Sequence, residues 1–182
     1  MARRIEEPRA SGVFNAKQKS SVAKDAFQRE AKLILDGWVD RRRRNNKGEI
    51  SETEERPADW MLRCTYRLVR SLIAKRHEGV LPDLADDIPG HSKGKTDISE
   101  KPFKLALLVM FHWNPELTSE PLLTRQRRSE LSDAMEYARR HKIQPRNLIG
   151  FIKAAGIKRI PSKLRNEQWE PGFETAQKAW RA

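Results

Sequence analysis

The stretch AMEYARRHKIQPRNLIGFIK, residues 134–153, decides the fold class of this 182-residue chain. Apolar residues recur at three- and four-residue steps on both sides of a polar break, which is the period of helices that bury one face. Pro145 is well placed to open the second helix, because its fixed φ suits a first turn and its missing N–H is not needed there. The spacing predicts two packed helices joined by a short turn, in a helix-turn-helix-like arrangement.

The residues of this stretch divide into an inner and an outer set. Ala138 is the small residue that close packing needs, Ile143 is an apolar residue for the turn, and Leu148 and Phe151 are expected on the inner face of the second helix. The outer face is expected to carry Gln144, Arg146, Asn147, Gly150 and Lys153. Near the start of a helix that enters a major groove, an arginine suits guanine and an asparagine suits adenine.

One position does not fit this pattern. The turn of a helix-turn-helix commonly contains glycine, whereas this chain has Lys142 there, for which a positive φ is less comfortable. The alternative is an ordinary pair of packed helices with a basic exterior. The sequence leaves both interpretations open.

Helical periodicity also covers most of the remaining chain. Helices are expected over residues 17–44, 57–78, 101–113, 121–142, 146–155 and 174–181. Gly48 and Gly79 are expected to end the first two, and Ile160-Pro161 to prevent a continuation of the fifth. Almost no segment alternates like a half-buried strand. The sequence therefore predicts a mainly α, small multi-helix protein.

We expect four parts: a mobile basic arm (1–15), a helical N-terminal lobe (16–79), a polar connector (80–100) and a helical, strongly basic C-terminal lobe (101–182). The longest apolar run, Leu105–Phe111, is far too short to span a bilayer, and the N-terminus does not resemble a secretory signal. Cys64 is the only cysteine, which fits a reducing compartment. These features favour a cytoplasmic protein without a membrane partner.

Charge is the strongest indication of function. The formal net charge is +12, and the segment Arg139–Arg165 contains nine Lys or Arg residues and no Asp or Glu. Such a concentration of one sign of charge repels itself unless a polyanion relieves it, and nucleic acid is the commonest polyanion. We therefore expect a nucleic-acid partner, with DNA favoured over RNA.

The candidate contacts lie on the surface of residues 119–165. They are Arg139, Arg140, Lys142, Arg146, Asn147, Lys153, Lys158 and Arg159. Secondary phosphate contacts are expected from Arg41, Arg42, Arg43, Arg44, Arg63, Arg67 and Arg70, of which the last three could equally pair with the acidic stretch 49–55. Trp169 and Trp180 are expected to dock on another lobe or on a protein partner.

The leading hypothesis is a non-catalytic protein that binds double-stranded DNA, with a regulatory or architectural role and no cofactor. One alternative is an interaction subunit of a larger nucleoprotein complex that contacts an RNA or DNA backbone and a protein. A second is a metal-dependent nuclease using Asp83, Asp86 and Asp87. Nucleotide binding at Gly94-Lys95-Thr96 is disfavoured, because only three residues separate Gly90 from Gly94 where a phosphate-binding loop needs four. A zinc site is disfavoured separately, because the four histidines lie far apart in the sequence.

Overall fold

The computed structural model describes residues 16–89, 101–112 and 123–181. Within these ranges the regular structure is entirely helical, so the prediction of a mainly α, multi-helix protein is confirmed. None of the helices in the described ranges is long and apolar enough to cross a membrane. The predicted basic arm and the glycines at 90 and 94 lie outside the described residues.

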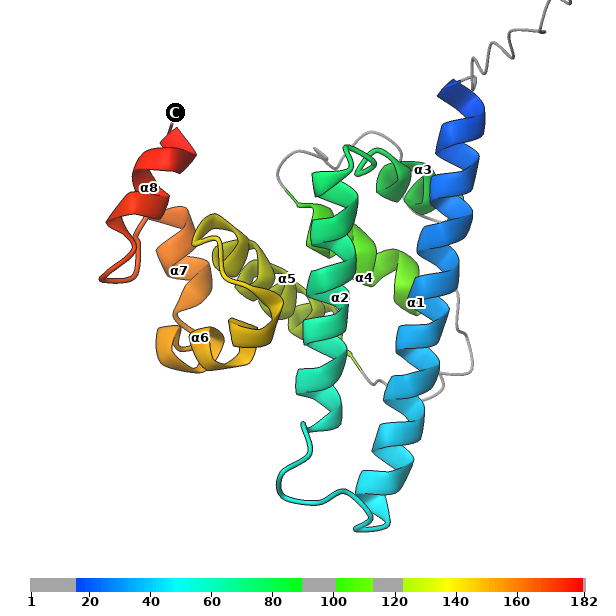
Figure 1. The fold of residues 1–182 in the computed structure, drawn as a ribbon, viewed down its shortest axis with the longest axis horizontal. Coiled ribbons are helices and arrows are strands. Elements are labelled where there is room, and N and C mark those ends of the chain that lie inside the picture. Colours follow the sequence, from blue (N-terminus) through cyan, green and yellow to red (C-terminus); the bar gives the residue numbers. More distant parts are fainter. Residues whose placement is uncertain (1–15, 90–100, 113–122, 182) are drawn as a thin grey trace, which may run out of the picture.

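The first two helices form a long hairpin, α1 (Ala16–Asn46) and α2 (Pro57–Ala74), seen at the right and centre of Figure 1. Phe27, Leu35 and Trp38 of α1 are buried against the rest of the core. Gly37 allows close contact, because a Cβ at this position would lie 2.7 Å from the ring of Trp60 on α2. As predicted, Pro57 stands in the first turn of α2 and Gly48, at φ +71°, follows the end of α1.

The third helix corrects two expectations. α2 was expected to end at Gly79, but it ends five residues earlier, at Ala74, and Arg76 follows it at φ +56°. Gly79 instead precedes α3 (Val80–Asp86). The start of the predicted polar connector is therefore a helix with a buried face. Val80, Leu81, Leu84 and Ala85 are buried there, and Ile88 beyond it is buried as well. The helix forms because these apolar side chains cover α4 and α1.

α4 (Pro102–His112) is the helix predicted over residues 101–113, and it is buried on almost every side. It packs against α1, α2, α3 and α5, so one core cluster extends through both predicted lobes. Trp38 meets Phe111 edge-on at 5.5 Å, and Tyr66 stacks on Phe103 at the same separation. α4 is thus the apolar centre of the molecule.

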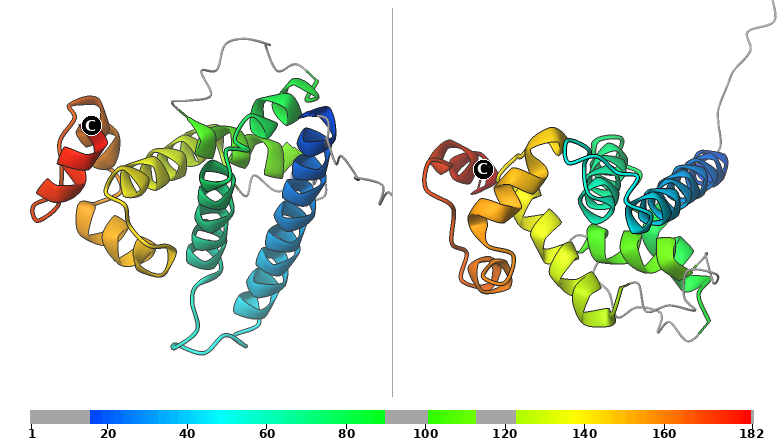
Figure 2. Two further views of the ribbon diagram at one scale, coloured as in Figure 1. Left: turned by 45° about the horizontal axis from the view of Figure 1, so that its top comes forward. Right: turned by 90° about the horizontal axis from the view of Figure 1, so that it is seen from below.

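The C-terminal part is assembled on α5 (Arg125–Arg140), which runs outward from α4 in Figure 2. A short 3₁₀ helix, η2 (Pro145–Asn147), leads into α6 (Leu148–Ala155), which Gly156 ends at φ +78°. α7 (Ile160–Arg165) and α8 (Glu174–Arg181) follow. The fifth predicted helix does not continue to Ile160-Pro161, because α6 ends at Ala155. Pro161 instead occupies the first turn of a new helix, α7, where its missing N–H is harmless.

Candidate nucleic-acid interface

The turn between α5 and α6 is a tight helix end. The N–H of Lys142 donates to the carbonyl oxygen of Arg139 at 2.9 Å, and the N–H of Ile143 donates to that of Ala138 at 3.0 Å. This pair of bonds is the Schellman motif, in which glycine usually takes the left-handed position. Lys142 takes it here, at φ +56°. The sequence pattern thus identified the position at which a left-handed residue is needed, and the residue at that position is a lysine.

The side chains around the turn divide as the sequence predicted. Ile143 and Leu148 are buried, and Phe151 packs on the rings of Tyr137 and His141 at 5.8 and 5.0 Å. The predicted outer residues are all exposed, namely Gln144, Arg146, Asn147, Gly150 and Lys153. α6 therefore presents a polar face on which Arg146 and Asn147 lie at the entry to the helix.

The turn is also held from α2. Tyr66 Oη donates to the carbonyl oxygen of Ile143 at 2.9 Å, and Arg70 Nη1 donates to the same oxygen at 2.6 Å. Burial raises the pKa of the Tyr66 hydroxyl to about 12, so it stays a donor. Arg70, predicted as a secondary phosphate contact, thus has an internal hydrogen bond. Nothing in its local sequence indicates a partner 73 residues away.

Three of the predicted contact residues have partners within the protein. Arg139 forms a bidentate ion pair with Glu136. Lys153 lies 3.8 Å from Asp59 on α2, and Arg140 lies over the ring of Trp169 at 5.9 Å. The side chain of Lys153 is nevertheless 69 % exposed, so this pair is weak and open to competition.

Four other predicted cations have no carboxylate partner in the described part of the chain. Lys142, Arg146, Lys158 and Arg159 are exposed, and none forms an ion pair with a residue in the described ranges. They lie in the turn, at the start of η2 and in the link from α6 to α7. The positive charge of a solvated side chain is not neutralised when no carboxylate lies nearby, so the side chain is available to bind an external anion.

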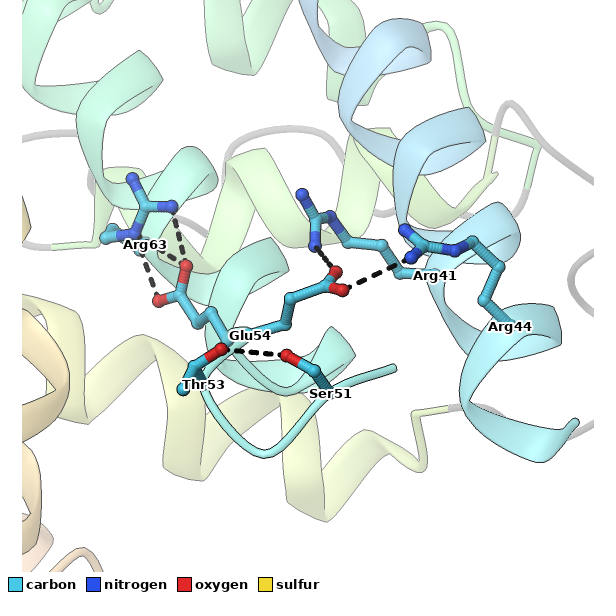
Figure 3. Close-up of polar contacts among 7 residues, drawn as sticks. Arg41, Arg44, Ser51, Thr53, Glu54 and Arg63 are labelled. Carbon is cyan, nitrogen blue, oxygen red and sulfur yellow. Dashed lines mark hydrogen bonds and ion pairs between the residues drawn. The ribbon is translucent and has the colours of Figure 1, made fainter. Parts of the chain in front are cut away.

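The basic cluster at the end of α1 is different, because acidic residues of the α1–α2 loop neutralise it. Arg41 and Arg44 lie 3.8 and 3.3 Å from the two carboxylate oxygens of Glu54, as Figure 3 shows. Arg63 forms a bidentate pair with Glu55 at 2.6–3.0 Å, which raises the pKa of its guanidinium. The predicted alternative, pairing with the acidic stretch 49–55, therefore holds for Arg63.

The remaining cations of the secondary set behave in three ways. Arg43 pairs with Asp40 at 2.9 Å, and Arg42 lies over the ring of Trp38 at 5.4 Å. Arg67 is exposed on α2. Arg42 and Arg43 therefore contact residues of their own helix, and Arg67 stays an exposed candidate contact.

Trp169 packs on its own chain. Its ring lies 4.7 Å from that of His141, which is buried at the end of α5. His141 Nδ1–H donates to the carbonyl oxygen of Tyr137 at 2.8 Å, and the N–H of Glu170 donates to Nε2 at 3.0 Å. Burial lowers the pKa of this imidazole, in accord with a neutral ring. The side chain of Trp180 lies outside the described residues.

The described residues gather no group of three or more His, Cys, Asp or Glu side chains that could hold a metal ion. Asp83 of the predicted acidic trio lies 3.5 Å from Lys24 of α1. No known protein family matches the chain, and neither a curated protein nor a solved structure is similar enough to count as a match. Function is therefore inferred from the chemistry of the described side chains.

Proposed function

We propose that this protein binds double-stranded DNA through the α5–α6 turn and the exposed face of α6. The observation that carries the proposal is a contrast within one molecule. Arg41, Arg43, Arg44 and Arg63 near the hairpin tip have carboxylate partners, whereas Lys142, Arg146, Lys158 and Arg159 have none among the described residues. These four cations lie within a short stretch around one helix, where each is available to bind a phosphate of the DNA backbone.

The shape of α6 suits a duplex. An α-helix with its side chains is about 10–12 Å across, which a major groove roughly 12 Å wide admits, and α6 presents its exposed face to such a groove. Arg146 and Asn147 enter first and have the hydrogen-bonding groups to read base edges. Lys158 and Arg159 follow the helix, where they would hold phosphates on either side of the groove. In this arrangement the residues at the start of the helix read the bases, and the residues in the link to α7 position the protein on the DNA backbone.

Fluorescence anisotropy with labelled duplex DNA, single-stranded DNA and RNA tests this between about 50 and 200 mM salt. We expect duplex binding to weaken steeply with salt. Lys158→Ala with Arg159→Ala should reduce the slope of log affinity against log salt by about two, because two phosphate contacts are lost. Arg146→Ala should instead lower affinity for the preferred sequence and leave other duplexes nearly unchanged.

The matched control is Arg29→Ala with Lys75→Ala, which removes the same charge from exposed positions on α1 and just beyond α2. Equal loss of slope in this variant would show that only the net charge matters. Tighter binding to single strands or RNA would replace duplex DNA as the ligand. Weak binding to every nucleic acid would favour the alternative of an interaction subunit within a nucleoprotein complex.

A further inference from the structure

We propose that Tyr66 and Arg70 of α2 are positioning residues that set the orientation of α6 on DNA, an inference that rests on the proposed function. Both side chains donate to one carbonyl oxygen, that of Ile143, at 2.9 and 2.6 Å. A carbonyl has two lone pairs, so two donors from different directions saturate it and fix its direction. We name this pair of bonds to the Ile143 carbonyl the α2 clamp.

The donors are themselves held firmly. Tyr66 is fully buried, and its ring stacks on Phe103 of α4 at 5.5 Å. Arg70 lies one helical turn further along α2, with its guanidinium over the Tyr66 ring at 5.5 Å. A side chain whose rotamer is locked by packing transmits its position to whatever it binds. The clamp thus fixes the position of the α5–α6 turn relative to α4, the apolar centre of the molecule.

The residue that the clamp holds is fixed at three points. The N–H of Ile143 donates to Ala138, its carbonyl accepts from α2, and its side chain is buried. The preceding residue, Lys142, is in the left-handed region, which a non-glycine residue keeps only where its surroundings enforce it. The clamp is therefore part of what makes this turn conformation persist.

The clamp lies close to the side chains that would read bases. Arg146 is three residues after Ile143, and both η2 and α6 pack against α2. Specific recognition requires contact groups to be held within about 0.5 Å of the productive position. At the other end of α6, Lys163 Nζ donates to the carbonyl oxygen of Ala155 at 3.1 Å, and Ile152 and Ala155 are buried. The clamp therefore acts on the start of α6, where Arg146 and Asn147 lie.

This role differs from that of a phosphate contact, and the two make opposite predictions for Arg70. A phosphate contact is retained by Arg70→Lys and lost in Arg70→Gln, with a decrease of about one in the salt slope. A positioning residue alters sequence preference and leaves the salt slope unchanged. Tyr66→Phe keeps the buried ring and removes only the hydroxyl donor, so it tests the clamp with the fold preserved.

The experiment uses the full chain with Tyr66→Phe, Arg70→Gln, Arg70→Lys and the double variant Tyr66→Phe/Arg70→Gln. Lys75→Gln, at an exposed cation five residues from Arg70 at the C-cap of α2, is the matched control. The first measurement is hydrogen exchange of the backbone amides of residues 142–150 without DNA. The second is the ratio of affinities for a duplex enriched from a random pool by the wild-type chain and a scrambled duplex of the same composition.

In the double variant, we expect exchange over residues 142–150 to accelerate about tenfold, because the Ile143 carbonyl loses both donors. The affinity ratio should fall at least about fivefold, while the salt slope stays the same. Unchanged exchange and ratio would overturn the inference, as would a salt slope lowered by Arg70→Gln and restored by Arg70→Lys. If the wild-type chain enriches no sequence, the proposed function fails, and the exchange data alone then decide whether the clamp orders the turn.

Discussion

At the scale of single residues, Lys142 has the least favourable backbone conformation around the candidate site. Its φ of +56° places Cβ near the following carbonyl oxygen, which costs about 1–2 kcal/mol in an L-residue and nothing in glycine. The strain persists because the Schellman bonds and the α2 clamp hold both neighbours.

We predict that Lys142→Gly stabilises the protein by about 0.5–1 kcal/mol, since relief of strain exceeds the entropy that glycine adds to the unfolded chain. Urea unfolding of the two proteins measures the difference. Lys142→Ala removes the same charge but keeps a Cβ in the left-handed position, so it should give no such gain. Equal stabilisation by both changes would attribute the effect to charge. Both should weaken duplex binding if Lys142 contacts a phosphate.

His141 makes stability depend on pH, and the direction follows from its environment. Burial among Tyr137, Trp169 and Phe173 lowers its pKa, and protonation of Nε2 would break the bond from the N–H of Glu170. The unfolded chain therefore binds the proton more readily than the folded one. The stabilisation is complete above the unfolded pKa of about 6.5 and is lost as pH falls below it.

We therefore predict a lower free energy of unfolding at about pH 5.5 than at about pH 7.5, measured by urea denaturation. His141→Gln, which keeps an acceptor for the Glu170 amide, should reduce this difference. His112→Gln is the control, because His112 is exposed on α4. Glu170, whose pKa is lowered by Lys163 and Tyr137 in spite of some burial, contributes only at more acidic pH. An identical pH dependence in the two variants would show that another group is responsible.

At the scale of elements, four helices end in the same way, and only one of them uses glycine. α1, α2, α5 and α7 each close with the two Schellman bonds, and the left-handed residues are Gly48, Arg76, Lys142 and Glu167. The expectation that a helix ends at a glycine finds the end of α1 but places the end of α2 too late, because an arginine such as Arg76 does not indicate a helix end in the sequence. The packing of the residues beyond the helix, such as the buried Val80, determines where it stops.

The same reasoning explains which parts of the site the sequence could predict. The inner and outer faces of α6 follow from periodicity, because an amphipathic helix has one favourable orientation on a core. The clamp from Tyr66 and Arg70 joins residues more than 70 positions apart, so no local pattern contains it. The Glu54 pairs of Arg41 and Arg44 likewise require the path of the loop between α1 and α2.

α3 was missed because seven residues show too little of a helical period, and Pro82 resembles a break. Its burial leads to a direct test. Leu84 is 1 % exposed, so Leu84→Ala should lower the free energy of unfolding by about 3 kcal/mol, through lost burial and the cavity left behind. Asp86→Ala, at an exposed position of the same helix, is the control and should change it little. A small effect of Leu84→Ala in denaturant titrations would mean that α3 does not cover the core.

At the scale of the whole molecule, α4 joins the hairpin and the C-terminal helices in one apolar core, while the charges remain unevenly placed. The α1–α2 hairpin carries most of the ion pairs described, whereas the cations around α6 have few acidic neighbours. Exposed pairs contribute at most about 1 kcal/mol each. The formal net charge of +12 should therefore make repulsion the larger electrostatic effect on folding.

We predict that the melting temperature rises by several degrees between about 20 and 200 mM NaCl, as the screening length falls to roughly 7 Å. Lys158→Glu with Arg159→Glu should reduce this rise, since it removes repulsion where the cations are concentrated. Arg29→Glu with Lys75→Glu changes the net charge equally at distant positions and should reduce it less. A melting temperature that falls with salt would show that the ion pairs dominate. DNA binding should show the opposite salt dependence, because the cations that repel each other in the free protein are those that phosphate neutralises.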